Sequence, residues 1–430
     1  GALLYLFFGN KRTAKPLKKR LQSVESSGDP HPLPVGETPF AGGKRMEQTI
    51  RWLERKTGYP LCKAQPVRYY PLGDNMFPDM LRDMKSAKRS IYIEYFIIEP
   101  GQMWDAMMEV LEDKLRQGVD VRVMYDDLGS ISSFNFSNAR ELTQKGIPCV
   151  PFNPLLALKG TANYRDHRKM LIVDNEIAYS GGINLSDRYI NLEHPYGHWK
   201  DTGFRLTGEG VHSFTHMFLT FWNAFALKKG EAGTPMPALQ DSAEAPRETD
   251  GYVLSYYDSP LEHDATSNQL FIDLLSQSTD YAWFFTPYLM LGDDLMAAML
   301  AAARRGVDVR IIMPGIPDKK LIFRMSRSFY QVLLNGGVKI YEYTPGFVHA
   351  KSFVSDDKVA TIGTVNLDYR SLFLHFENNS LFYRSSIVEK IKEDFLTTQA
   401  LCSEVQPYDK KRYSRRWAVD GLLRIFAPLC

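Results

Sequence analysis

The sequence is poor in cysteine and carries almost no excess charge of either sign. Its 430 residues include only four cysteines, Cys62, Cys149, Cys402 and Cys430, and no two of them are close in the chain. This spacing excludes a CxxC metal knuckle and suggests no disulfide framework, so it favours a reducing, cytosolic environment. The 52 Lys and Arg residues nearly balance the 50 Asp and Glu residues, and a formal charge of +2 gives no argument for nucleic acid.

The apolar stretch that opens the sequence, residues 3–8, is too short to cross a bilayer, which takes about 20 apolar residues. Six Lys and Arg residues follow it between positions 11 and 20. Because a basic flank after an apolar segment fits the positive-inside rule, we expect residues 1–9 to be the end of a truncated membrane helix. Residues 10–45 would then be a basic juxtamembrane segment and linker, and a solvated run of charge is the alternative.

Two parts of the chain repeat each other. The sequence RQGVDVR at residues 116–122 matches RRGVDVR at residues 304–310. In both, an apolar helical pattern ends at glycine and passes into a valine-rich strand, which predicts an α/β fold built from two similar lobes. The predicted boundaries are 46–226 for lobe 1, 227–250 for a linker, 251–405 for lobe 2 and 406–430 for a basic amphipathic C-terminal segment.

The pattern HxKxxxxD occurs once in each predicted lobe. Chance gives one such pattern in roughly one of twenty chains of this length, so two copies are not accidental. Each copy is followed, at the same spacing, by a turn of small residues and an asparagine. The members are His167, Lys169, Asp174 and Asn184 in the first copy, and His349, Lys351, Asp356 and Asn366 in the second.

The spacing of this pattern suits chemistry on a phosphodiester. Histidine and lysine two residues apart in a strand project to the same face, so an imidazole and an ammonium share one pocket. The imidazole can attack phosphorus or move a proton, and the ammonium offsets charge on the non-bridging oxygens. Asn184 and Asn366 can donate hydrogen bonds to the same oxygens. Asp174 and Asp356 belong to the catalytic motif but lie at opposite parity, and we expect them to hold the strand end and the turn.

An activated histidine needs an acceptor on its other ring nitrogen to fix its tautomer. Asp201 and Glu377, each downstream of the motif of its own lobe, are the candidates for this role, and a structural carboxylate is the alternative for each. His212 and His216 stand four residues apart in a helical stretch, but no third ligand accompanies them. We therefore predict helix packing there, and neither a metal nor a cofactor for the chain.

The duplicated motif with its asparagine turns resembles the phospholipase D superfamily, from residue 68 to residue 401. Three segments resemble bacterial cardiolipin synthases more narrowly: YRDHRK at 164–169, GGIN at 181–184 and NLDYRS at 366–371. The sequence departs from that pattern at Gly203 and His375, where His and Asn are common. The resemblance implies two phospholipase D-like lobes, each a mixed sheet flanked by helices, related by a pseudo-two-fold axis and sharing one active site.

The same resemblance implies a phosphatidyltransferase that joins two phosphatidylglycerol molecules, giving cardiolipin and glycerol. His167 would attack to form a phosphatidyl-histidine intermediate, and His349 would serve as acid and base. The expected partners are phosphatidylglycerol and anionic membrane lipid, not nucleic acid, with the catalytic body on the cytoplasmic side of the cell membrane. A phospholipase D-type hydrolase or another phosphatidyltransferase would use the same residues, and a superfamily nuclease is the weaker alternative.

Overall fold

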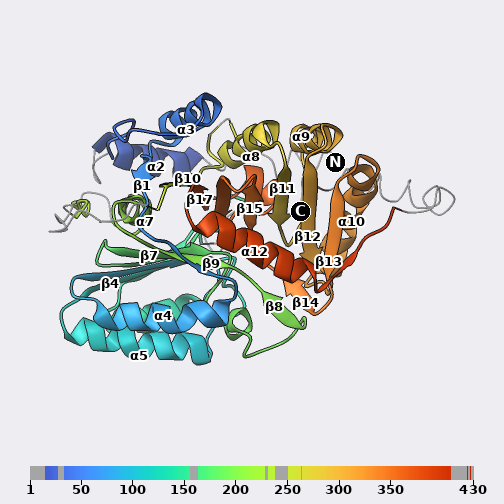
Figure 1. Ribbon diagram of the computed structural model, residues 1–430. Helices are drawn as coiled ribbons and strands as arrows, with labels where there is room; N and C mark the ends of the chain where they lie inside the picture. Colours follow the sequence, from blue (N-terminus) through green and yellow to red (C-terminus); the bar gives the residue numbers. More distant parts are fainter. Residues whose placement is uncertain are drawn as a thin grey trace.

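The computed structural model describes residues 15–27, 33–154, 163–227, 231–237, 250–262 and 264–407, together with residues 424 and 427. The predicted membrane-helix end, residues 1–9, lies outside these ranges, as do most of the predicted linker and most of the predicted C-terminal segment. Within them the chain forms two α/β lobes, each built on one mixed sheet flanked by helices (Figure 1). The predicted fold class is confirmed.

Lobe 1 is a seven-stranded sheet in the order β2-β9-β7-β6-β3-β4-β5. Strands β3, β4 and β5 run parallel, and the others pair antiparallel. Helices α4 and α5 cover one face of this sheet (Figure 1). The elements are β2 (Arg68–Tyr70), α4 (Gly73–Ser86), β3 (Ser90–Tyr95), α5 (Gln102–Arg116), β4 (Asp120–Asp126), α6 (Phe136–Gln144), β5 (Cys149–Phe152), β6 (Lys169–Val173), β7 (Ile177–Gly181), β9 (Gly203–Thr207) and α7 (Val211–Phe225).

Lobe 2 repeats this plan in a nine-stranded sheet, in the order β1-β10-β17-β16-β15-β11-β12-β13-β18. Its parallel strands are β11, β12 and β13. The elements are β1 (Cys62–Lys63), β10 (Tyr252–Asp258), α8 (Thr266–Gln277), β11 (Tyr281–Phe285), α9 (Asp293–Arg304), β12 (Asp308–Pro314), α10 (Lys320–Asn335), β13 (Lys339–Tyr343), β15 (Ser352–Ser355), β16 (Val359–Gly363), α11 (Tyr369–Phe373), β17 (Glu377–Tyr383), α12 (Ile387–Gln399) and β18 (Cys402–Glu404).

The repeated sequence marks the same joint in both lobes. Gly118 ends the turn between α5 and β4, and Gly306 ends the turn between α9 and β12, with φ angles of 85° and 95°. Side chains other than glycine rarely adopt this left-handed conformation, which explains why glycine closes both helices. The helix-to-strand joints predicted from the repeat are therefore present.

The predicted boundary of lobe 1 at residue 46 is wrong. Strand β1 lies in the sheet of lobe 2, where Cys62 pairs with Val253 at the edge of β10. Helix α3 (Lys44–Thr57) also packs on lobe 2, and its Thr49 hydroxyl accepts a hydrogen bond from Gln277 of α8 at 2.9 Å. The segment crosses over because β1 extends the sheet at β10 and α3 buries its apolar stripe against α8.

Part of the predicted juxtamembrane segment is a helix that packs on the protein body. Helix α2 (Lys15–Ser27) lies on α7 and buries Leu21, while most of its other side chains are exposed. Among the described residues, none of the helices is both long and apolar enough to cross a bilayer.

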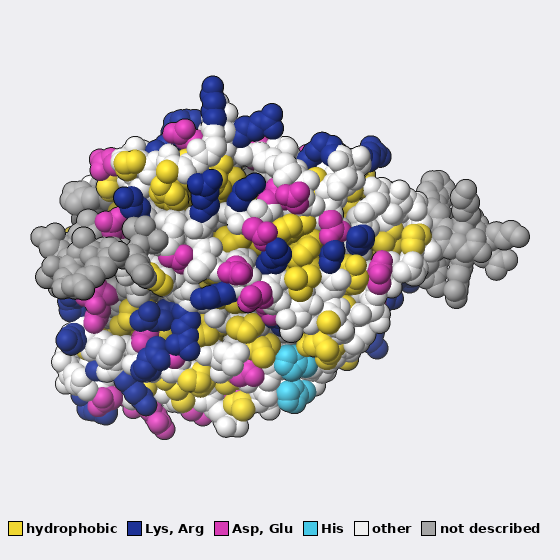
Figure 2. All heavy atoms as spheres, viewed as in Figure 1, with side chains coloured by type: hydrophobic (Ala, Val, Ile, Leu, Met, Phe, Trp, Pro, Cys, Tyr) yellow, Lys and Arg dark blue, Asp and Glu magenta, His cyan; other side chains and the backbone are white. Residues whose placement is uncertain are grey.

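Basic side chains gather over the part of lobe 1 that holds α4 (Figure 2). Two aspartates of this helix pair with arginines: Arg68 lies 2.8 Å from Asp79, and Arg205 lies 2.6 Å from Asp83. Elsewhere on the face shown, acidic and basic side chains are interspersed.

Candidate active site

The two motifs meet because a backbone segment of each lobe forms hydrogen bonds with the motif segment of the other lobe. Strand β14 (Gly346–Val348) leads into His349 and pairs in parallel with β8 (His198–Lys200) of lobe 1. The N–H of His349 donates to the carbonyl of Lys200 at 2.7 Å. In the equivalent place, the N–H of His167 donates to the carbonyl of Phe376 at 2.9 Å. The residue after each of these carbonyls is an acid, so each acid is delivered to the histidine of the opposite lobe.

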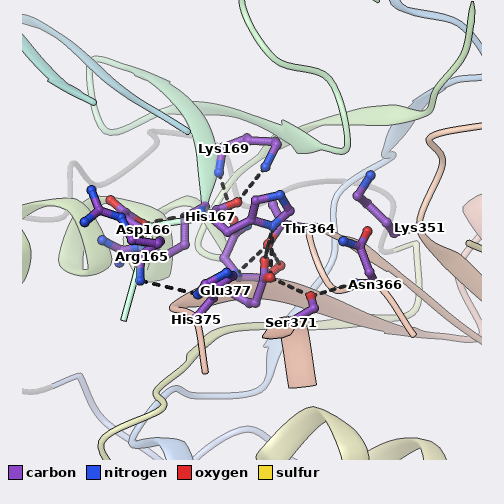
Figure 3. A network of polar contacts seen from close by, with 12 residues as sticks. Arg165, Asp166, His167, Lys169, Lys351, Thr364, Asn366, Ser371, His375 and Glu377 are labelled. Carbon is purple, nitrogen blue, oxygen red and sulfur yellow. Dashed lines mark hydrogen bonds and ion pairs between the residues drawn. The ribbon is translucent and has the colours of Figure 1, made fainter. Parts of the chain in front are cut away.

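Each motif histidine has its Nδ1 on a buried carboxylate. Nδ1 of His167 lies 2.9 Å from both carboxylate oxygens of Glu377 (Figure 3). Nδ1 of His349 lies 2.6 Å from Oδ2 of Asp201. Both acids named from the sequence are thus beside the motif histidines. Their assignment to the motif of their own lobe is wrong, because both lie on the segments that cross between lobes.

The motif lysines lie beside their histidines. Nζ of Lys169 donates to the carbonyl of His167 at 2.6 Å, and Nζ of Lys351 donates to the carbonyl of His349. Both lysines are 2 % exposed or less, and the histidines are 9 % and 7 % exposed. The site therefore holds two imidazoles and two amines with little access for water.

The two carboxylates are fixed by different means. Glu377 accepts hydrogen bonds from the hydroxyls of Ser371, at 2.5 Å, and Thr364. Asp201 instead accepts the N–H of Thr202 at 2.8 Å. Gly182 stands where the second copy has Thr364, and a Cβ there would lie 2.1 Å from Oδ1 of Asp201. The sequence shows this difference between the copies, GG against GT. Which carboxylate gains or lacks a hydroxyl donor as a result depends on which acid lies opposite, and that follows only from the structure.

Burial shifts the ionisation of every group in this cluster. It lowers the pKa of His167 and His349 well below the usual value, and the nearby lysine ammoniums lower it further. It raises the pKa of Glu377 to about 8 and lowers the pKa of Lys169 to about 7. A neutral imidazole whose Nδ1–H is donated to the carboxylate leaves the lone pair on Nε2 available for attack or proton transfer.

The motif aspartates lie away from the histidines. Lys169 begins the five-residue strand β6 and Asp174 follows its last residue, so the two lie about 16 Å apart at ~3.3 Å per residue. Asp174 accepts hydrogen bonds at 2.7–2.8 Å from the N–H groups of Lys88, Arg89 and Ser90. Asp356 does the same at 2.8–3.0 Å with Thr279, Asp280 and Tyr281. Each aspartate thus holds the start of a neighbouring central strand, and neither touches the reacting groups.

The two asparagines differ in their surroundings. Oδ1 of Asn184 accepts the N–H of Ile97 at 3.0 Å, and its Nδ2 donates to the hydroxyl of Tyr189 at 2.9 Å. Asn366 lies beside Lys351 (Figure 3), and its Oδ1 is buried with no hydrogen-bond partner among the described residues. The role of both asparagines in binding phosphate stays a prediction.

Three buried ion pairs fix the backbone on either side of His167, and sequence reasoning did not find them. Arg165 lies 2.9 Å from Asp126, which also accepts the N–H of Asp166 at 2.9 Å. Arg168 lies 2.9 Å from Asp166 and also pairs with Glu94. No sequence signal could have found the pairs with Asp126 and Glu94, because these two acids lie on β4 and β3, far from the motif in the chain.

Rings also flank the first motif histidine. The ring of Phe96 contacts His167 edge-on with centroids 4.8 Å apart, and the ring of His375 lies 6.4 Å away. The N–H of Arg165 donates to Nδ1 of His375 at 3.4 Å. Of the predicted helical pair, His216 contacts the hydroxyl of Tyr59 at 3.2 Å, as expected for packing.

Comparison with known proteins matches this architecture. The family model described as cardiolipin synthase, PLD-like domain, matches residues 80–199 and 271–398, one match in each lobe. A Streptococcus mutans protein described as uncharacterized is 46% identical over 388 residues, covering 90% of this chain and 83% of that protein. A cardiolipin synthase from Halalkalibacterium halodurans is 30% identical over 439 residues, covering 100% of this chain and 86% of that protein.

Among solved structures, phosphatidylserine synthase from Haemophilus influenzae superposes with a TM-score of 0.64 at 14% identity. The match covers 89% of this chain and 100% of that one, and it shows a common fold. Because the family model matches both lobes and named relatives align along the whole chain, this protein belongs to the cardiolipin synthase family of phospholipase D-like proteins and is a phosphatidyltransferase.

Proposed function

We propose that the protein is a cardiolipin synthase that joins two phosphatidylglycerol molecules, giving cardiolipin and glycerol. The observation that carries the proposal is the pair of buried histidines, each with Nδ1 on a carboxylate and each beside a buried lysine. Such a site can supply a nucleophile, an acid and base, and two cations for the phosphate oxygens without further groups.

In the first step, Nε2 of His167 attacks the phosphorus of phosphatidylglycerol and forms a phosphorus–nitrogen bond. The bond from phosphorus to the glycerol oxygen breaks, and His349 gives that oxygen its proton. The phosphodiester anion and the carboxylate of Asp201 stabilise the imidazolium form of His349 that this step needs. Lys169 and Lys351 offset the charge on the two non-bridging oxygens.

In the second step, His349 takes the proton from the terminal hydroxyl of a second phosphatidylglycerol. Its oxygen attacks phosphorus, the phosphorus–nitrogen bond breaks, and His167 is regenerated with cardiolipin as product. We assign attack to His167 because the phosphorylated imidazole carries positive charge, and Glu377 meets Nδ1 with both oxygens. The two hydroxyls that hold Glu377 keep that carboxylate in place during both steps.

Transfer to a lipid alcohol competes with hydrolysis, and burial of the site favours transfer because it restricts water. We also propose that the protein works at the surface of the cell membrane, on its cytoplasmic side. Exposed apolar residues support this: Ile316 and Leu321 are 40% and 61% exposed, and the exposed Lys319 and Lys320 lie between them in the chain. Apolar side chains beside lysines suit an interface with anionic lipid.

The test is mass-spectrometric product analysis after the detergent-solubilised protein is incubated with phosphatidylglycerol alone. We expect cardiolipin and free glycerol, and neither product from His167→Ala. His212→Ala, which changes a histidine of α7 outside the site, is the matched control and should behave as the wild type. Phosphatidic acid as the main product of the wild type would make the protein a hydrolase and refute the synthase proposal.

A further inference from the structure

The two copies share one more residue that the mechanism above does not use. Both continue after the turn as Asn-Leu-x-x-Arg, which places Arg188 in the first copy where Arg370 stands in the second. Arg188 lies in a short 3-10 helix, η2 (Asp187–Ile190), and Arg370 lies in α11. The two arginines are therefore at equivalent positions in the two halves of the site.

Arg188 lies one ring away from His349. Its guanidinium carbon is 5.5 Å from the ring centre of Tyr189 and 5.8 Å from that of Trp199. Those two rings pack on His349, with centroid distances of 5.3 and 5.5 Å. The positive charge of Arg188 also contributes to the lowered pKa of His349, as expected for a cation held close to it in a buried site.

The guanidinium of Arg188 is incompletely paired. Its Nε is buried and has no hydrogen-bond partner among the described residues. Its one acidic neighbour in that part of the chain, Glu99, is 3.4 Å from Nη2 and also accepts the hydroxyl of Ser186 at 2.5 Å. Buried donors in folded proteins are nearly always hydrogen-bonded, and guanidinium is shaped to grip a phosphate. A cation with an unused buried donor, separated from a catalytic histidine by one aromatic ring, is suited to an anionic group of the substrate.

We propose that Arg188 binds the phosphate of the acceptor phospholipid. The inference rests on the proposed function, in which the leaving glycerol and the entering hydroxyl both occupy the side of the site next to His349. The hydroxyl of phosphatidylglycerol that enters there is tethered, through three carbons and one ester oxygen, to the phosphate of its own lipid. That phosphate must lie a short distance beyond His349, on the side of the site where Arg188 lies.

Arg370 provides a matched control from the other half. Its Nε is also buried without a partner among the described residues. Its positive charge contributes to the lowered pKa of His375, whose ring lies 6.4 Å from that of His167. Because His167 attacks phosphorus on the face opposite the departing glycerol, no acceptor alcohol enters on the side of Arg370. The direction of the reaction, and not local geometry alone, distinguishes the two arginines.

The experiment compares two acceptors with the same donor. Cardiolipin formation from phosphatidylglycerol uses an acceptor that carries a phosphate, and incorporation of isotope-labelled glycerol into phosphatidylglycerol uses one that does not. We expect Arg188→Gln to lower the rate of cardiolipin formation relative to glycerol incorporation by roughly 10- to 100-fold, the usual effect of losing a hydrogen bond between charged groups. Arg188→Lys should recover part of this ratio, and Arg370→Gln should keep the ratio of the wild type.

An equal loss of both reactions in Arg188→Gln would overturn the proposal, because it would show a structural role. A selective loss in Arg370→Gln instead would place the acceptor on the other half and overturn it as well. Thermal melting of each variant reports folding, and Arg188→Lys gives the same ratio test if the glutamine variant melts early. Failure of the proposed function looks different: the wild type itself would then give phosphatidic acid and no cardiolipin.

Discussion

Replacing Glu377 by glutamine tests the crossed pairing between the lobes. The imidazole of His167 becomes positively charged when it is phosphorylated, and the carboxylate oxygens of Glu377 lie 2.9 Å from its Nδ1. Two unit charges at that distance interact by about 6 kcal/mol at an effective dielectric constant of about 20. Glutamine keeps an acceptor for the Nδ1–H and keeps its hydroxyl neighbours, but it loses this charge.

We therefore expect Glu377→Gln to lower the rate of cardiolipin formation by about 10³- to 10⁴-fold, since each factor of ten corresponds to about 1.4 kcal/mol. In serine proteases, neutralising the aspartate behind the catalytic histidine costs about 10⁴ in kcat, which is the same order. Initial rates by mass spectrometry measure the effect. The matched control is Glu176→Gln, an exposed glutamate paired with Arg89, which should keep wild-type rates. A loss of less than tenfold in a folded Glu377→Gln protein would refute the reasoning.

Three further predictions concern stability and positioning. Asp174→Ala leaves three backbone N–H groups of lobe 1 without their acceptor, so we expect the free energy of unfolding to fall by about 2–4 kcal/mol in denaturant titration. Burial raises the pKa of Glu377 to about 8, so wild-type stability falls as pH rises from about 4.5 to 8. Glutamine does not ionise, so the unfolding free energy of Glu377→Gln relative to wild type should increase between pH 5 and pH 8. A difference in unfolding free energy that does not change with pH would contradict this. Gly182→Ala pushes a Cβ against Asp201 and should lower activity about 10²-fold, whereas Gly43→Ala, which meets nothing within 4 Å, should not.

Much of the fold could be predicted because the sequence contains an internal repeat, one copy in each lobe. The glycines at 118 and 306 stop equivalent helices, and the two HxKxxxxD copies place equivalent strands, so the lobes and their joints follow from comparing the chain with itself. The lobe boundary could not be predicted in the same way. Strand β1 has only two residues, and its place at the edge of β10 depends on which sheet offers a free edge.

The site shows the same division. Sequence spacing was enough to put Lys169 next to the backbone of His167 and Asp174 beyond the far end of β6, because these relations are local. The expectation that His167 lies in the strand itself is wrong, since β6 begins at Lys169. The partner of each histidine is not local: 148 positions separate His349 from Asp201, and 210 separate His167 from Glu377. Chain order suggested the nearer acid in each lobe. The parallel pairing of β8 with β14 brings Asp201 to His349 instead, and the parallel bridge between Asp166 and Phe376 brings Glu377 to His167.

The exchange of acids between the lobes has a consequence for how the enzyme becomes active during synthesis and for how it evolved. Neither half contains a complete histidine–carboxylate couple. A nascent chain therefore cannot be active until the segment with Glu377 has been synthesised and has packed on the first half. A one-lobe forebear with these residues would have needed a second copy of itself to complete either couple. Fusion of two such genes would have linked the two subunits of a dimer in one chain. The two copies of each residue could then diverge, as Gly182 and Thr364 have done.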